Sequence, residues 1–426
     1  MRLGVPLVCA LVLIFGACSA ADEGTGTESV TSSTPVSVTD LPAASTTTSS
    51  TTTTSITTPA STTTTLVPVA VPMVWQRVPD DGVFTDSSIA VVVGGGPGLV
   101  AGGAVFDVDL YRNAGPWGSS RAALWISEDG AVWERIDDSI LFADDASDVP
   151  SAISGISDIA VGPLGFAAVG SHIWISSDGL SWSRVVDDLE DIGFIHGVTA
   201  GGPGWVAVGD SGVDALAWVS SDGLEWTLVE DEDLLAGDMV AAELREVTLG
   251  GPGLVAVGSV GVYGGSGDTA QQAAVWISED GIDWERLPDG TFAGDMVFEG
   301  VTSDVASDRI IALGVDKGIW HSFDGQEWIK TEWALPLGGP ATSSGVAWDG
   351  ERLVAGGEDW ELSVWASLDD GLTWHRIEPD GVTFAVDDIA HDVVLVGSRF
   401  VAVGEAPGLP GEPPRGVVWI GEWTDR

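Results

Sequence analysis

Four polar or ionisable side chains stand at one recurring position of this chain, near the start of short apolar strands. They are Ser157, His196, Arg245 and His391, and acids follow three of them, at Asp158, Glu246 and Asp392. Ala90 and Ser344 hold the same position in two further places. Imidazole, guanidinium and carboxylate groups brought together can bind a polar ligand, so His196, Arg245, His391, Asp158, Glu246 and Asp392 are candidate binding residues. The alternative is that they are strand-end side chains in a water-filled channel.

Acidic residues also crowd the segments that lead into these strands. Asp137, Asp138, Asp144 and Asp145 precede Ser157, and Glu230 to Asp233 precede Arg245. Carboxylates could hold a cation, and Ca²⁺ is considered, but no loop with alternating oxygen ligands and a turn glycine is evident. We therefore predict no metal site and no cofactor. The same segments hold recurring aromatic residues that we expect to pack against the neighbouring repeat: Phe84, Phe142, Phe194, Phe292 and Phe384.

The overall charge excludes one class of partner. The chain has 64 acidic residues against 16 Lys and Arg, a formal net charge of -48. Nucleic-acid binding needs a basic surface and is disfavoured. An evenly acidic chain also fits a surface adapted to solubility or to salt. The two cysteines, Cys9 and Cys18, lie near the N-terminus, so the folded part has no disulfide.

One phrase recurs along the chain and predicts its structural unit. It reads AVWISEDGIDWERL from Ala274, and further copies start at Ala123, His172, Leu216, Gly318 and Ser363. Each copy predicts a β-hairpin in which Asp-Gly turns the chain and two tryptophans flank the turn. The Asp carboxylate and the Ser hydroxyl can both accept backbone N–H groups there. A worn copy, VVWIGEW, lies near the C-terminus.

The copy SLDDGLTW, from Ser367 to Trp374, resembles the Asp-box or BNR motif, S-x-D-x-G-x-T-W. Sialidases, sortilin-type receptors and photosystem II assembly propellers carry this motif. The resemblance implies a β-propeller and a structural role for the motif, and not catalysis. The residues assigned this structural role are Ser127, Asp129, Gly130, Trp133, Ser176, Asp178, Trp182, Ser220, Asp222, Trp226, Ser278, Asp280, Trp284, Ser322, Asp324, Trp328, Ser367, Asp369, Gly371 and Trp374.

A second phrase, GGPGLVAVG at Gly250 to Gly258, also recurs, and the two phrases together repeat about every 50 residues. They predict an all-β fold: a single seven-bladed β-propeller of four-stranded antiparallel blades. Trp75 to Pro79 matches the outer strand of a repeat but precedes the first one. We predict that this N-terminal strand closes blade seven, with residues 423–426 as the alternative.

The N-terminal region predicts export and anchoring. Residues 1–17 read as a lipoprotein signal peptide, with Cys18 as the lipidated residue; the alternative is ordinary cleavage near Ala20. Residues 18–72 are a Thr/Ser-rich linker that we expect to be disordered, and residues 73–426 form the propeller. We expect a monomer on the extracellular face of a bacterial membrane that touches the membrane only through its lipid. Secretion is the alternative.

Function is predicted less directly than fold. The longest variable segments, 104–120, 259–272 and 405–415, all lie on the face opposite the Asp-box turns, so a ligand is expected there. We predict a non-catalytic propeller that binds a glycan or a protein. The alternatives are a sialidase-like extracellular glycoside hydrolase and an envelope assembly factor. No catalytic residue is transferred from sialidases, because Tyr111 and Tyr263 lie in insertions and the recurring arginines fall on outer strands.

Overall fold

The computed structural model describes residues 71–116, 119–136, 155–185, 193–237, 240–263, 269–288, 290–294, 296–304, 308–314, 318–332, 345–359, 361–369, 371, 373–377 and 388–424. The predicted signal peptide, Cys18 and the linker up to residue 70 lie outside these residues, as do Phe142, Ser344 and Phe384. The described residues belong to one compact unit that spans residues 67–426.

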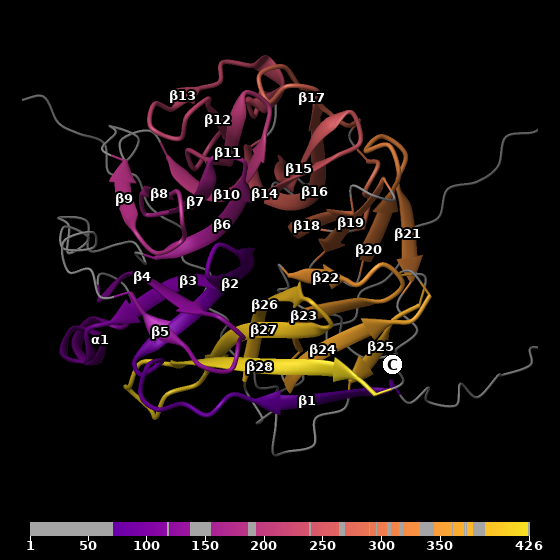
Figure 1. The fold of residues 1–426 in the computed structure, drawn as a ribbon. Helices are drawn as coiled ribbons and strands as arrows, with labels where there is room; N and C mark the ends of the chain where they lie inside the picture. Colours follow the sequence, from indigo (N-terminus) through magenta and orange to yellow (C-terminus); the bar gives the residue numbers. More distant parts are fainter. Residues whose placement is uncertain are drawn as a thin grey trace, which may run out of the picture. The chain divides into compact units, whose positions relative to one another are not determined.

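Seven four-stranded antiparallel sheets form the blades of a propeller, as predicted (Figure 1). Blade one comprises β2 (Ser87–Gly95), β3 (Gly98–Phe106), β4 (Ser120–Ser127) and β5 (Glu134–Arg135). Blade two comprises β6 (Ile156–Gly162), β7 (Gly165–Gly170), β8 (Ile173–Ser176) and β9 (Trp182–Val185). Blade three comprises β10 (Phe194–Gly201), β11 (Gly204–Asp210), β12 (Ala215–Ser220) and β13 (Thr227–Leu228). Blade four comprises β14 (Ala241–Gly250), β15 (Gly253–Tyr263), β16 (Thr269–Ser278) and β17 (Trp284–Arg286). Blade five comprises β18 (Phe298–Asp304), β19 (Arg309–Gly314), β20 (Gly318–Ser322) and β21 (Ile329–Glu332). Blade six comprises β22 (Val346–Trp348), β23 (Leu353–Asp359), β24 (Glu361–Ser367) and β25 (His375–Ile377). A short 3₁₀ helix, η2 (Glu232–Leu234), precedes blade four.

Blade seven joins the two ends of the described chain. It consists of β26 (Ile389–Val396), β27 (Arg399–Ala406), β28 (Arg415–Trp423) and the N-terminal strand β1 (Met73–Arg77), and Figure 1 shows indigo β1 beside yellow β28. Trp75 pairs with Gly421, so the predicted closure by the N-terminal strand is confirmed. The alternative outer strand is wrong, because Trp423 ends β28 instead.

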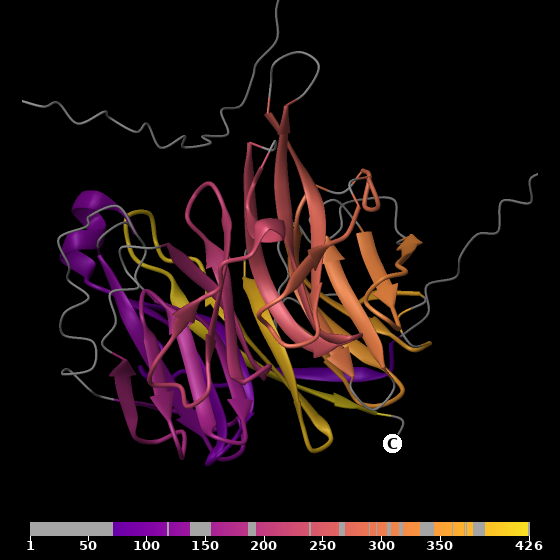
Figure 2. The ribbon, with the colours of Figure 1, turned by 90° about the horizontal axis from the view of Figure 1, so that it is seen from above.

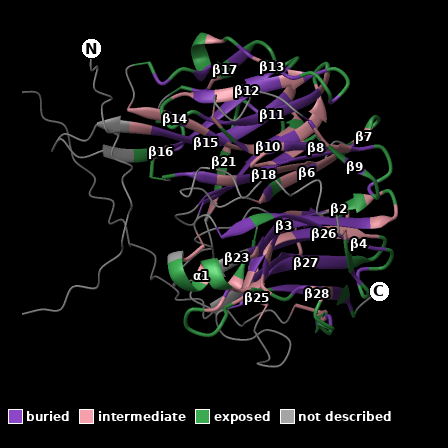
Figure 3. Cartoon of the chain, turned by 90° about the vertical axis from the view of Figure 1, so that its left-hand side faces the viewer, coloured by how far each residue is buried: buried purple, intermediate pink, exposed green. Residues whose placement is uncertain are grey.

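The hydrophobic core lies between neighbouring blades and not within one sheet. One buried cluster combines Val206 and Ala217 of blade three with Leu244 and Ala256 of blade four. The second strand of each blade is therefore covered on both faces, which explains its run of small aliphatic residues. Figure 3 shows this buried interior, with exposed residues concentrated in the turns. The inner strands contact one another around the ring, and β26 contacts β2.

The Asp-box turns share one hydrogen-bond pattern. In blade four the Ser278 hydroxyl accepts the N–H of Gly281 at 2.8 Å, and Asp280 Oδ1 accepts the N–H of Ile282 at 2.9 Å. The indole N–H of Trp284 donates to the Gly281 carbonyl at 3.0 Å. The indole-to-glycine bond recurs at Trp133, Trp182, Trp226, Trp328 and Trp374. Gly281 has a φ of 81°, a conformation that glycine adopts without strain.

Two of the three long segments differ from the loops expected. Segment 104–120 contains α1 (Val108–Ala114), whose N-cap is Asp107. In blade four the strands themselves continue, since β15 pairs with β16 as far as Tyr263 and Thr269. Figure 2 shows α1 (indigo) and the end of the β15–β16 hairpin on the same side of the ring. Structured elements therefore frame this face, which is the one opposite the Asp-box turns.

Candidate functional site

Three of the six predicted binding residues, His196, Arg245 and His391, are the extra residues of β-bulges on the inner strands. In six blades the pairing of the first two strands skips one residue, where the inner strand carries one residue more than its partner. The skipped residues are Ala90, Ser157, His196, Arg245, Glu299 and His391. Glu299 in blade five belongs to this set and was not recognised from the sequence. A bulge changes the direction in which its side chain points, and here the bulges of six blades place mostly polar side chains around the channel.

His196 and Arg245 each lie against a carboxylate of their own blade. His196 Nε2 lies 2.7 Å from Asp210 Oδ2, and Arg245 Nη2 lies 3.1 Å from Glu243 Oε2. Burial raises the pKa of Asp210, but the hydrogen bond and charge of His196 outweigh burial and the pKa is lowered. Burial also raises the pKa of Glu299, despite the nearby charge of Arg245. His196 and Arg245 are thus paired within the channel, which is rich in carboxylates.

The three acids that follow the bulges lie close together, half-buried in the channel. Asp158 accepts the N–H of Ile159 on its own strand and the N–H of Val198 in blade three, both at 2.7 Å. Asp392 likewise accepts the N–H of Val393 at 2.7 Å and, in blade one, that of Val92 at 2.8 Å. These two carboxylates therefore tie neighbouring inner strands to each other.

Glu246 completes this group of acids. Its side chain hydrogen-bonds to Asp158 and accepts the N–H of Val247 at 3.0 Å. Burial raises the pKa of Asp158 to about 6 and that of Asp392 to about 7. Burial and the charge of Asp158 hold the pKa of Glu246 well above its usual value. Among the described residues, no group of three or more His, Cys, Asp or Glu side chains has the arrangement of a metal site.

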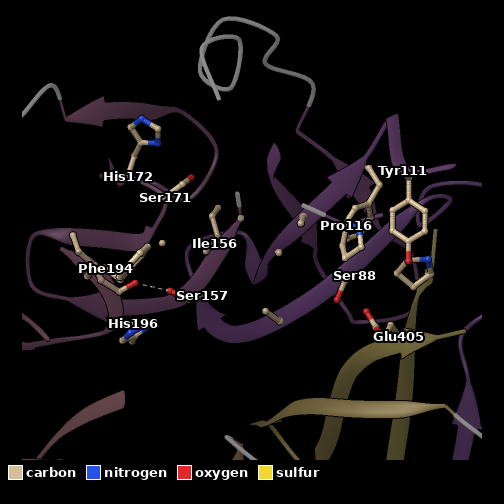
Figure 4. Close-up of a pocket in the computed structure, with 18 of the residues that line it drawn as sticks. Ser88, Tyr111, Pro116, Ile156, Ser157, Ser171, His172, Phe194, His196 and Glu405 are labelled. Carbon is tan, nitrogen blue, oxygen red and sulfur yellow. Dashed lines mark hydrogen bonds between the residues drawn. The ribbon is translucent and has the colours of Figure 1, made fainter. Parts of the chain in front are cut away.

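A pocket of about 690 Å³ opens at the channel mouth between blades one, two, three and seven (Figure 4). Its lining is mainly apolar and aromatic, with a few polar side chains. The apolar members include Phe106, Tyr111, Ile156, Phe194 and Ile195, and the polar ones include Ser88, Ser157, His172, His196 and Glu405. The Ser157 hydroxyl lies 3.1 Å from the Val169 carbonyl and 3.2 Å from that of Ile195, which joins two of the contributing blades.

Only one of the six candidate residues, His196, lines this pocket. Arg245, His391, Asp158, Glu246 and Asp392 lie elsewhere in the channel, although His391 Nε2 is 3.9 Å from the pocket residue Glu405. Phe106, Tyr111 and Glu405 belong to two of the long segments where a ligand was expected, but sequence reasoning did not single them out, and it assigned Phe194 to packing. The packing expected for the recurring phenylalanines holds for Phe84 and Phe292, which are 1% and 2% exposed. For Phe194 it is wrong, since that side chain is 58% exposed at the start of β10.

The described part of the chain contains no helix with the length and hydrophobicity of a membrane span.

Comparison with known proteins identifies the fold. No protein-family model and no curated protein matches the sequence. The fold is similar to that of YCF48 from Cyanidioschyzon merolae, at 15% identity and a TM-score of 0.53, covering 82% of this chain and 98% of that one. A structure of YCF48 bound to D1 peptide matches at 14% identity and a TM-score of 0.50, covering 82% and 97%. U3-55K matches at 12% identity and a TM-score of 0.48, covering 82% and 98%.

Proposed function

We propose that this protein is a non-catalytic binding propeller that holds a segment of another protein in the pocket at the channel mouth. The observation that carries the proposal is the pocket of about 690 Å³, because it combines apolar and aromatic walls with a few polar groups. Pockets of this size and composition are typical ligand sites. The exposed ring of Phe194 gains free energy when a ligand covers it.

The chemistry of the walls favours a peptide over a glycan. A sugar presents many hydroxyl groups, and burying them without hydrogen-bond partners is unfavourable. This lining offers few polar side chains, and the His196 imidazole is already paired with Asp210. One protein of similar fold, YCF48, has been seen with a peptide bound. A glycan ligand is the alternative.

The placement of the carboxylates favours binding over hydrolysis. A glycosidase needs two carboxyl groups on either side of the bond to be cut. Asp158 and Glu246 hydrogen-bond directly to each other and to backbone N–H groups, and they do not line the pocket. Glu405 is the pocket's one carboxylate among the described lining residues.

We place this propeller outside the cell, attached through a lipid on Cys18 and held off the membrane by the Thr/Ser-rich linker. The proposal is supported by the sequence of residues 1–72, in which a signal-like apolar run precedes Cys18. Release by cleavage near Ala20, giving a secreted protein, is the alternative. A role in assembling envelope proteins is compatible with peptide binding.

The function is tested by selecting phage-displayed random peptides on the purified full chain, with a glycan array read in parallel for retention and cleavage. We expect enriched peptides whose retention falls at least about tenfold with Phe194→Ser, a loss of about 1.4 kcal/mol. The matched control is Leu224→Ser, which removes an equally exposed apolar side chain (57%) from an Asp-box turn. Glycan cleavage, or peptide retention insensitive to Phe194→Ser, would overturn the proposal.

A further inference from the structure

The two ends of the pocket differ in chemistry. Figure 4 shows Ser88, Tyr111, Pro116 and Glu405 grouped at one end, on blades one and seven. His172, Ser171, Phe194 and His196 lie at the other, on blades two and three. We call the first group the acidic end. The apolar end is the part of the second group around the Phe194 ring. A ligand that fills both must carry two different groups.

The acidic end presents an ionised carboxylate. Glu405 lies near the end of β27, with 24% of its side chain exposed. Burial raises its pKa, but hydrogen bonds from His391 and Ser88 and the charge of His391 outweigh burial, so the pKa is lowered. Glu405 therefore keeps its negative charge at neutral pH, inside a domain that is itself strongly acidic.

The Tyr111 ring lies with this carboxylate at the acidic end (Figure 4). The Tyr111 ring meets the Phe106 ring edge-on at 5.4 Å between centroids. Arg112, the next residue of α1, binds Glu412 of blade seven through Nη2 at 2.7 and 2.9 Å, which links α1 to that blade. A carboxylate and an aromatic ring in one subsite suit an ammonium or a guanidinium group.

The apolar end offers the opposite chemistry. The Phe194 ring is more than half exposed, and the buried residues Ile156 and Ile195 also line the pocket. The His196 side chain is hydrogen-bonded to Asp210. An aliphatic or aromatic side chain would cover this surface.

We propose that the pocket recognises a basic side chain and a neighbouring apolar side chain in the same peptide segment. The basic group binds Glu405 beside the Tyr111 ring, and the apolar group covers Phe194. This inference rests on the proposed function and names its ligand class. The net charge of -48 attracts a cationic segment and accelerates its encounter with the site.

The test is fluorescence anisotropy of the full chain with labelled peptides that carry one Lys and one Leu, separated by zero to three Gly. Each peptide is paired with a copy in which acetyl-lysine replaces Lys. We expect the Lys peptides with a fitting spacer to bind at least about tenfold more tightly than their acetylated copies. We expect a higher salt concentration to weaken the binding of the Lys peptides only, because salt screens the attraction between charges.

Two variants locate this preference. Glu405→Gln abolishes the discrimination between Lys and acetyl-lysine, whereas Glu128→Gln, at an exposed Asp-box site, leaves it unchanged. Tyr111→Leu removes the aromatic ring but no charge, and we expect it to reduce the discrimination. This variant remains informative even where Glu405→Gln also disturbs His391. Equal binding of both peptide forms with loss in Phe194→Ser contradicts the inference and leaves the binding function standing. Failure of all peptides, including those enriched by phage display, overturns both.

Discussion

The glycine that ends the second repeated phrase lies opposite a bulge, where it allows the two backbones to approach closely. A Cβ at Gly103, Gly170, Gly209, Gly258 or Gly404 would lie between 1.8 and 2.1 Å from a carbonyl oxygen of the inner strand. Each of these glycines pairs with the residue just before the bulge, as Gly258 does with Leu244. Only a residue without a side chain fits there, so the bulge and the glycine depend on each other.

Replacing this glycine should destabilise the fold. Gly258→Ala places a methyl group 2.1 Å from the Glu243 carbonyl oxygen, and neither backbone can move freely. We expect the free energy of unfolding to fall by about 3 kcal/mol in urea titration. Gly94→Ala is the control, because its Cβ meets nothing nearer than Val396 Cγ2 at 3.8 Å. Similar losses in both variants would refute the role assigned to Gly258.

Single residues also show where sequence reasoning stopped. The aligned positions of His196, Arg245 and His391 could be predicted, because the following apolar strand fixes the register. Phe194 was grouped with Phe84 and Phe292 by type alone. Those two stand six and seven residues before their bulge residues, whereas Phe194 stands two before His196, within the strand. That spacing was available in the sequence and separates the exposed ring from the buried ones.

At the scale of elements, two sets of carboxylates respond oppositely to pH. In the Asp-box turns, backbone N–H groups lower the pKa of Asp129, Asp178, Asp222, Asp280 and Asp324. A lowered pKa adds stability that is present above the unfolded value near 4 and is lost as the pH falls below it. On the inner strands, the raised pKa values of Asp158 and Asp392 add stability below pH about 4 that is lost as the pH rises through about 6 to 7.

Stability should therefore peak in mildly acidic solution, and Glu246→Gln should reduce the loss toward neutral pH. The Gln amide donates permanently to Asp158, where the Glu carboxyl must keep a proton to do so. We expect this variant to gain about 1 kcal/mol or more over the wild type at pH 8 and less at pH 4. Urea unfolding across this range, with Glu285→Gln on the outer strand β17 as control, measures the effect. A gain independent of pH would contradict the assignment.

For the whole molecule, closure by β1 should dominate stability. Trp75 is 7% exposed and packs with Trp419 and Trp423, while Arg77 binds the buried Asp388 at 2.9 Å. Trp75→Ala should cost about 3 to 5 kcal/mol of unfolding free energy. Val74→Ala on the same strand, where the side chain is 58% exposed, should cost less than about 1 kcal/mol. Thermal unfolding distinguishes the two, and equally small shifts in Tm would contradict the role assigned to Trp75.

The sequence predicted the blades more completely than the pocket for a physical reason. Six of the blades are each formed by consecutive strands of the chain, so their turns, tryptophans and strand pattern repeat about every 50 residues. The matching strand at Trp75 also predicted how the seventh blade is closed. The pocket combines Tyr111, Ile156, Phe194 and Glu405 from four blades, and no local pattern links them. The helix α1 was likewise not predicted, because its seven residues are too few to show a helical periodicity. The segment was interpreted as a loop.

The central claim, that the ligand occupies the pocket between blades one, two, three and seven, is tested most directly by amide hydrogen exchange with and without a selected peptide. The account predicts added protection in residues 103–113, 155–157 and 193–196, and at Glu405, with no change in the Asp-box turns. Protection confined to the Asp-box turns or to the outer strands would contradict it.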